Sequence, residues 1–223
     1  MESKLLDQMI VHRLDYATSG LIVFARHVSV LKALHEQFRQ KRVKKNYKAI
    51  VCRGNFHPSS RSQAVDGRGA HTMPALEGEI SLPILRDAQR GPPFHCAKDV
   101  EGVGKPSLTI WRVHAMRTGQ MPLEMTDMDQ TGPRPYEDEP TTYVDHTLAL
   151  LSMEPRTGRT HQLRIHAADC GMPICGDPFY APLPVTALAP RLLLHAENLV
   201  LTHPVTGKPM SFHAQAPFRL RSA

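Results

Sequence analysis

The sequence predicts an α+β domain built on a mixed, mainly antiparallel sheet with flanking helices and loops. Short apolar runs of strand character are mixed along the chain with two segments whose apolar residues recur at helical spacing, and the C-terminal part has a hairpin pattern. The chain has 223 residues, of which 41% are hydrophobic, and this suffices for one core without a disulfide or a metal. We therefore expect residues 1–223 to form a single domain.

The first half of the chain contains two expected strands, one helix and an insertion. Residues 21–25 are continuously apolar after a Thr-Ser-Gly sequence, which is typical of a buried strand. Apolar residues then recur at helical spacing over residues 28–38, which predicts a helix. Alternation over residues 47–52 predicts a second strand. Residues 55–78 are rich in Pro, Gly and Ser without periodicity, and we interpret them as an insertion.

The second half adds strands, a helix and a second insertion. Residues 109–113 have strand character, and residues 118–141 combine Gly, Pro and acidic residues in what we interpret as a solvated acidic loop. Residues 146–153 are strongly apolar and predict another strand. Residues 160–170 show a helical pattern followed by a glycine that ends it. Alternation on both sides of a Pro-Gly segment predicts a hairpin over residues 199–212.

Composition excludes several classes of protein and is compatible with a nucleic-acid partner, although many domains of similar charge bind no nucleic acid. No stretch approaches the ~20 apolar residues of a membrane span, and the N-terminus has an early acid and no apolar segment of a secretory signal. Four cysteines are too few for a disulfide framework, so we expect a reducing, cytoplasmic location, or an organelle if an N-terminal segment is missing. The net charge of +6 suits a polyanion, and residues 39–48 carry six basic residues and no acid.

Two segments near the ends of the predicted elements are candidate chemical sites. Residues 12–20 place Asp15 just before an expected strand, where a carboxylate can act as nucleophile or base and the preceding arginine can bind phosphate or a base. The same residue types are also ordinary turn formers. Residues 44–48 surround Tyr47 with lysines, which suits a nucleic-acid backbone and a stacked base. The alternative is a basic loop with Tyr47 packed in the sheet.

A third candidate site lies at the start of the second helix. Residues 157–166 gather Arg159, His161, Arg164 and His166, and arginines at a helix N-terminus are typical of a phosphate or carboxylate site. The alternative is a solvated basic helix face. If Arg164 is buried it needs an acidic partner, for which Asp15 is one candidate. His161 and His166 are five positions apart rather than the four of a helical zinc pair, and no dinucleotide, P-loop or serine-hydrolase motif is present.

Four segments, in chain order, resemble the RluA-type family of RNA pseudouridine synthases. They are His12-Arg13-Leu14-Asp15 with Thr18-Ser19-Gly20-Leu21, then Lys45-x-Tyr47-x-Ala49, then the run from Gly158 to His166, then Gly176-Asp177-Pro178-Phe179-Tyr180. Their order and their spread over the chain make the resemblance highly specific. Ala17 and the segment 190–192 look most like members that act on both ribosomal and transfer RNA.

The resemblance implies the isomerisation of specific uridines in structured RNA to pseudouridine, with no metal or other cofactor. The uridine is flipped out, its C1′–N1 bond is broken, and the base is rejoined through C5. The resemblance makes Asp15 the catalytic aspartate, as nucleophile or as stabiliser of a sugar cation or glycal. It makes Tyr47 the residue packed against the base and Arg164 the partner of the aspartate. The implied substrate-binding residues are Arg13, which fills the space left by the uridine, and His12, Thr18, Lys45, Arg159 and His161.

The resemblance also implies that the N-terminal part of the domain is missing. Family members carry a further strand before the first motif, which begins here at residue 12. We expect a monomer that binds a stem-loop of ribosomal or transfer RNA and no membrane. The alternative function is a truncated, catalytically impaired RNA-binding protein of the same fold. A hydrolase using Asp15 and His161 ranks last, because no matching base or metal arrangement is found.

Overall fold

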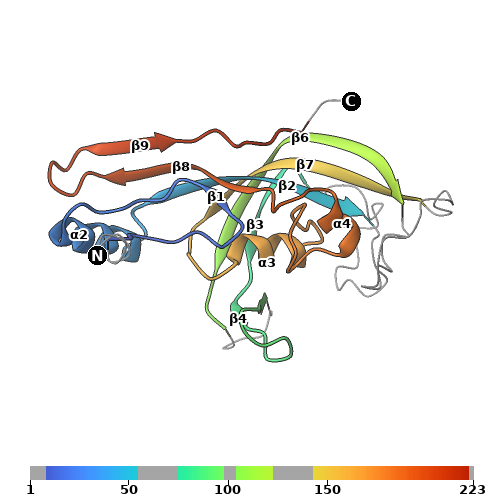
Figure 1. The fold of residues 1–223 in the computed structure, drawn as a ribbon, viewed down its shortest axis with the longest axis horizontal. Coiled ribbons are helices and arrows are strands. Elements are labelled where there is room, and N and C mark those ends of the chain that lie inside the picture. Colours follow the sequence, from blue (N-terminus) through green and yellow to red (C-terminus); the bar gives the residue numbers. More distant parts are fainter. Residues whose placement is uncertain (1–8, 55–74, 98–103, 123–142, 221–223) are drawn as a thin grey trace.

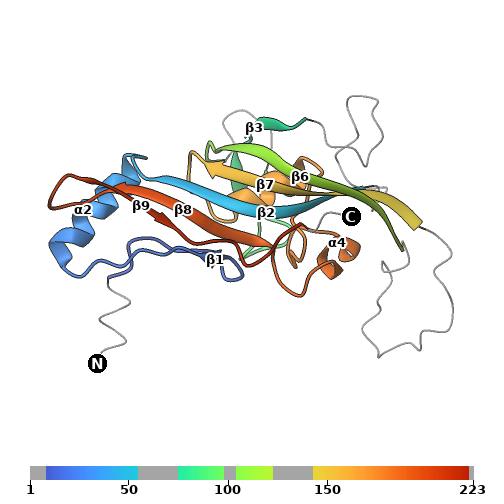
Figure 2. The same ribbon diagram turned by 90° about the horizontal axis from the view of Figure 1, so that it is seen from above.

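The computed structural model describes residues 9–54, 75–97, 104–122 and 143–220. In these ranges, seven strands form one sheet in the order β1-β8-β2-β7-β6-β3, with β9 also paired to β8 (Figures 1 and 2). Only the β1–β8 pair is parallel among the described strands, so the expected α+β class and mainly antiparallel sheet are confirmed. The elements are β1 (Ser19–Gly20), α2 (Val28–Arg39), β2 (Lys44–Gly54), β3 (Glu77–Ser81), β4 (Ile84–Arg86), β5 (His95–Ala97), β6 (Leu108–Pro122), β7 (Tyr143–Pro155), α3 (Gln162–Asp169), α4 (Leu183–Ala187), β8 (Leu194–Thr202) and β9 (Pro209–His213).

The helices lie on one side of the sheet, and a small arm formed by β4 and β5 projects on that side (Figure 1). Helix α3 packs through Leu163 against Val51 and Leu151 in the centre of the sheet. Helix α2 packs through Leu34 against Leu199 of β8 at one end. Burial of these apolar faces stabilises the fold by about 25 cal/mol for each Å² removed from water. No helix in the described ranges is long and apolar enough to cross a membrane.

Most of the elements predicted from hydrophobic periodicity are confirmed. The helices expected over 28–38 and 160–170 are α2 and α3, and the strands expected over 47–52, 109–113 and 146–153 lie within β2, β6 and β7. The C-terminal hairpin is β8–β9, and its register places Leu199 opposite Phe212 and Leu201 opposite Met210. The alternating pattern predicts these strands correctly because each strand turns one face to the core, so every second side chain is apolar.

The buried strand predicted over residues 21–25 is wrong. The regular strand β1 ends at Gly20, and the following residues make only irregular backbone bonds, such as Val11 N–H to Val23 O at 3.1 Å. The side chains of Ile22 and Phe24 are exposed. A short apolar run does not distinguish a strand buried on both faces from an extended segment that packs on one face only.

Both predicted insertions overlap regular strands. The interval 55–78 ends inside β3, which begins at Glu77, and the interval 118–141 begins inside β6, which continues to Pro122. The β6 end pairs with β7, with Thr118 opposite Thr147, so the ladder extends beyond the residues with strand-like composition. The remainders, 55–74 and 123–141, lie outside the described residues.

Candidate active site

The turn that carries Asp15 is held against the sheet by Gly20. The Asp15 carbonyl accepts the N–H of Thr18 at 2.9 Å and closes the turn. Strand β1 follows directly and places Gly20 opposite Ala196 of β8. Gly20 has a φ of +111°, and a Cβ there would lie 2.3 Å from the Ala196 oxygen. Only glycine permits this close approach, so Gly20 determines where the Asp15 turn lies.

Tyr47 approaches the same place from the neighbouring strand. β2 pairs with the other edge of β8, and Tyr47 lies opposite the same Ala196. The register of β8 therefore brings Tyr47 and the Asp15 turn together. Burial raises the pKa of Tyr47 to about 12, and the Asp15 carboxylate contributes to this rise. Tyr47 is thus a neutral phenol within electrostatic reach of Asp15.

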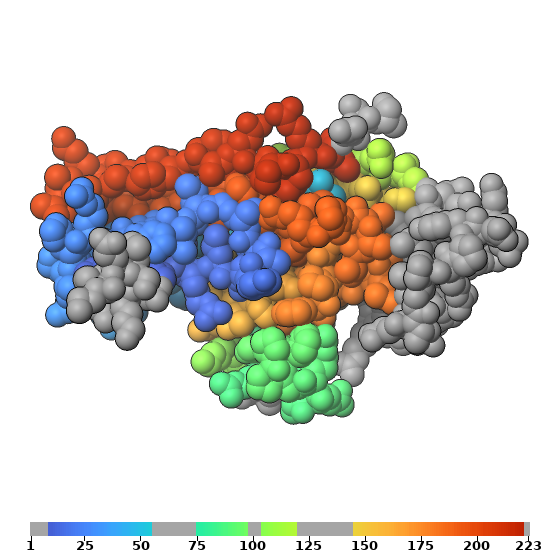
Figure 3. All heavy atoms as spheres, in the orientation of Figure 1, coloured from blue at the N-terminus to red at the C-terminus, as the bar shows by residue number. Residues whose placement is uncertain are grey.

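Asp15 and Tyr47 both line a cavity of about 180 Å³. This is below the ~300 Å³ at which pockets for drug-sized ligands begin, so the cavity suits a single base. Leu163 and Leu194 supply apolar walls. The N-terminal segment and the segment around α3 and α4 lie next to one another on one face of the molecule (Figure 3). Six of the nine site residues predicted from the sequence line this cavity: Arg13, Asp15, Thr18, Lys45, Tyr47 and Arg159.

Gln162 holds the cavity wall that contains Arg159. Its Oε1 accepts hydrogen bonds from the Thr157 hydroxyl at 2.7 Å and from the Arg159 N–H at 3.1 Å. Its Nε2 donates to the Leu108 carbonyl and to Thr109 Oγ1 of β6, at 3.0 Å each. The buried amide thereby fastens this turn to the sheet. The sequence analysis missed Gln162, although a polar residue in a segment of basic residues at a helix start was a usable signal.

Two polar side chains of the cavity, Thr18 and Lys45, are available to a ligand. Thr18 Oγ1 is buried and has no hydrogen-bond partner among the residues that the structure describes. Lys45 forms no ion pair within those residues, its ammonium lies 6.0 Å from the centre of the Phe38 ring, and burial lowers its pKa. Buried polar groups without a partner cost free energy, so both groups are ready to bind a ligand.

Arg164 pairs with Asp177, which corrects the expected pairing with Asp15. The Arg164 Nε donates to Asp177 Oδ2 at 2.8 Å, and its Nη2 donates to Oδ1. The side chains are only 2% and 1% exposed. Asp177 also accepts the backbone N–H groups of Phe179 and Tyr180, so it is the buried anchor of the segment after α3. The cost of burying a charge shows that a buried arginine needs a carboxylate, but the sequence does not show which carboxylate it is.

The two histidines of the predicted set do not line the cavity. His161 is the N-cap residue of α3, with a left-handed φ of 54°. Its Nδ1 lies 2.7 Å from the Tyr180 hydroxyl, which also accepts the backbone N–H of His95. Burial lowers the pKa of His161, while the charge of nearby Asp15 raises it. His12 stacks on Phe38, and its Nε2 accepts a backbone N–H, so both histidines support the site from outside.

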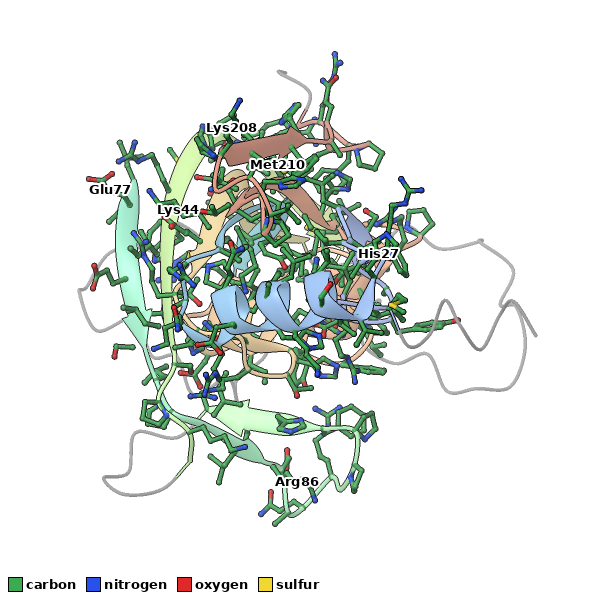
Figure 4. The ribbon with its side chains drawn as sticks, turned by 90° about the vertical axis from the view of Figure 1, so that its left-hand side faces the viewer. His27, Lys44, Glu77, Arg86, Lys208 and Met210 are labelled. Carbon is green, nitrogen blue, oxygen red and sulfur yellow. The ribbon has the colours of Figure 1, made fainter. Side chains whose placement is uncertain are left out.

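The cavity adjoins a basic groove of about 1440 Å³, which shares Lys45 and Arg159 with it. Seven basic side chains and two carboxylates line this groove. Figure 4 faces this end of the molecule, where α2 crosses in front of the sheet and Lys44 begins β2. The basic residues of the groove are Arg39, Lys41, Arg42, Lys44, Lys45, Arg156 and Arg159.

The loop between α2 and β2, which presents Lys41 and Arg42 to the groove, is fixed by Gln37. The buried Gln37 amide donates to the Thr202 carbonyl at 2.7 Å and accepts the Thr202 N–H at 2.9 Å. Its backbone carbonyl accepts the N–H of Arg42 at 2.9 Å, and Lys41 takes a left-handed φ of 56° in the bend. The backbone that carries these cations is therefore held in place before a ligand binds.

Comparison with known proteins identifies the family and agrees with the fold. The sequence profile of the RNA pseudouridylate synthase family matches residues 2–169. The chain belongs to this family, and its reaction is the isomerisation of uridine to pseudouridine in RNA. The resemblance found in the sequence motifs is thereby confirmed.

Similar proteins extend over nearly the whole chain. The dual-specificity RNA pseudouridine synthase RluA of Escherichia coli is 38% identical over 208 residues, which cover 93% of this chain and 73% of that protein. The protein of the same name from Pasteurella multocida is 35% identical over 207 residues, with the same coverage. Among solved structures, human RNA pseudouridylate synthase domain containing 1 has a TM-score of 0.65 at 25% identity, covering 94% of this chain and 69% of its own.

Proposed function

We propose that the cavity beside Asp15 binds a uridine flipped out of ribosomal or transfer RNA, and that Asp15 carries out its isomerisation. The observation that carries this proposal is the cavity itself, which joins Asp15, Tyr47 and four further predicted site residues and opens beside a basic groove. The choice of RNA follows from the similarity to the dual-specificity enzymes.

Asp15 supplies the negative charge that the sugar needs. In the reaction the C1′–N1 bond breaks, a C1′–C5 bond forms, C5 loses its proton and N1 gains one, so no oxidant or reductant is required. The Asp15 carboxylate acts at C1′, either as nucleophile or as stabiliser of a cationic or glycal intermediate. Arg164 is engaged by Asp177, so its role for Asp15 is to hold the surrounding segment in place.

Tyr47 packs against the base in this proposal. With a pKa of about 12, its hydroxyl remains protonated at neutral pH, and we assign its aromatic face to the contact with the base. The unpartnered Thr18 hydroxyl can bind a polar edge of the base or of the ribose. The cavity thus offers an apolar surface and a few polar groups, as base recognition requires.

Arg13 and the groove bind the rest of the RNA. Extrusion of a base costs a few kcal/mol, and Arg13, which is exposed at the cavity, offsets this cost by occupying the vacated space. The groove cations neutralise backbone phosphates, and this predicts affinity that falls steeply with salt. A monomeric state and a cytoplasmic location remain predictions.

Release of tritium from RNA labelled at C5 of uridine tests the proposal, because C5 must lose its hydrogen. Unmodified ribosomal and transfer RNA transcripts serve as substrates. We expect release by the wild-type chain, and a loss of more than ~10³-fold in Asp15→Ala with RNA affinity retained. Glu77→Ala, which alters an exposed carboxylate on β3 that lines neither the cavity nor the groove, is the matched control and should leave turnover unchanged.

Two outcomes contradict the proposal. Turnover by Asp15→Ala at the wild-type rate removes Asp15 from the mechanism. Binding of these transcripts without any tritium release, by protein shown to be folded, supports the impaired RNA-binding protein instead.

A further inference from the structure

Tyr16 is the most exposed large hydrophobic side chain among the described residues. Its relative exposure is 105%, so its ring buries no surface against the protein. Tyr16 and Ala17 are the two central residues of the turn that the bond between Asp15 and Thr18 closes.

Folding gives no reason for a tyrosine at this position. The central positions of turns favour small, polar or proline residues, and a ring that stays in water contributes no hydrophobic stabilisation. Tyrosine combines a flat apolar face with low conformational entropy, and for that reason it is enriched where proteins contact other molecules.

The position of Tyr16 in the turn places it at the rim of the cavity. Asp15 and Thr18, at the two ends of the turn, both line the cavity, whereas Tyr16 at the tip does not. Arg13, three residues earlier, lines the cavity and is itself exposed. The backbone of Tyr16 therefore lies between residues that line the cavity, and its exposed ring is attached at the cavity edge.

We propose that Tyr16 is a stacking platform for a base that flanks the target uridine, an inference that rests on the proposed function. Flipping leaves the neighbouring bases without a stacking partner on one side. Any base has a flat face that an aromatic side chain can cover. A neutral ring does not pair with phosphate, so Tyr16 binds the bases while the groove cations bind the backbone.

Binding by Tyr16 variants tests this assignment. Each variant is made together with Asp15→Ala, so that turnover does not disturb the measurement with unmodified transfer and ribosomal RNA transcripts. We expect Tyr16→Ala to weaken binding by about 5- to 100-fold and Tyr16→Phe by less than about 2-fold. Phe212→Ala removes an exposed ring on β9 that lines neither the cavity nor the groove, and it should leave affinity unchanged.

Salt dependence separates stacking from charge. The slope of log Kd against log salt should be the same in Tyr16→Ala as in the Asp15→Ala parent. Lys44→Ala should reduce this slope by the amount that corresponds to about one phosphate contact. A reduced slope in Tyr16→Ala, or equal weakening by Tyr16→Ala and Tyr16→Phe, overturns the stacking assignment.

Fluorescence gives a direct readout that does not depend on activity. The chain has one tryptophan, Trp111, which is only 5% exposed and provides a constant background. In Tyr16→Trp, the new exposed indole should be quenched when RNA binds and become protected from acrylamide. An indole that stays open to acrylamide in the RNA complex overturns the inference. Failure of the proposed function is distinguished by loss of tritium release in a chain with wild-type Asp15 and Tyr16.

Discussion

Replacing Asp177 with alanine should destabilise the protein more than any change at Asp15. Asp177 receives two hydrogen bonds from Arg164 and one backbone N–H each from Phe179 and Tyr180. Removing it leaves the Arg164 guanidinium buried without its counter-charge. Breaking a buried, hydrogen-bonded ion pair from one side costs about 3–5 kcal/mol.

This free energy corresponds to a large change in thermal stability. For a domain of this size, 1 kcal/mol shifts Tm by about 2–4 °C, so Asp177→Ala should lower Tm by about 6–20 °C. Asp15 makes no ion pair in the described part of the chain, and Asp15→Ala should change Tm by less than about 4 °C. The contrast between the two carboxylates follows directly from the partner of Arg164.

Thermal unfolding followed by circular dichroism at pH 7 measures both changes. Glu36→Ala is a matched control, because its pair with Arg39 is largely exposed, at 34% and 78%, and surface pairs contribute at most about 1 kcal/mol. The double variant Asp177→Leu with Arg164→Met replaces both charges by apolar groups and should recover part of the loss.

One pattern of results would refute this reasoning. If Asp177→Ala melts within about 2 °C of the wild type while Asp15→Ala loses several kcal/mol, Arg164 is paired with Asp15 after all.

Three further predictions concern single positions. Gly20→Ala should lower the free energy of unfolding by at least about 2 kcal/mol, because the new Cβ meets the Ala196 oxygen at 2.3 Å, and tritium release should fall as well. Unchanged stability in urea unfolding together with unchanged turnover contradicts the close approach. Burial lowers the pKa of His166 in the folded protein. As the pH falls, the unfolded chain therefore binds a proton at a higher pH than the folded chain, and the free energy of unfolding should decrease below about pH 6.5. Urea midpoints at pH 7.5 and 5.5 check this, and His166→Gln should flatten the dependence. Gln162→Ala should reduce turnover and cost about 2–3 kcal/mol by freeing the turn before α3, whereas unchanged kinetics would show that the turn is held otherwise.

The elements of the sheet were predictable where periodicity is long. The strands β2, β6 and β7 and the helices α2 and α3 follow from alternation or helical spacing, because each has one face on the core. Residues 21–25 were mispredicted, because five apolar residues contain too little pattern to separate a strand from an irregular segment.

The candidate site was predictable as a set of segments rather than as a geometry. The motifs singled out Asp15, Tyr47 and Arg159 because charged and aromatic residues stand at unusual density near element ends. Arg164 was expected beside Asp15, but its partner is Asp177. The role of Gln37 was missed, because an amide that fastens a turn has no charge or spacing that marks it. Gln162 was missed although it lies in the basic segment at the start of α3.

The sequence by itself determined the fold class, the family and the residue types available for chemistry, because these depend on local periodicity and on motifs that are contiguous along the chain. The tertiary structure alone decided which side chains share the cavity, which carboxylate neutralises Arg164, and that the Tyr16 side chain is fully exposed. The shared cavity depends on the register around Ala196 and on the approach of β1 to β8, which join residues more than a hundred positions apart. Contacts over such separations are set by the packing of the whole sheet, and a local pattern carries no information about them.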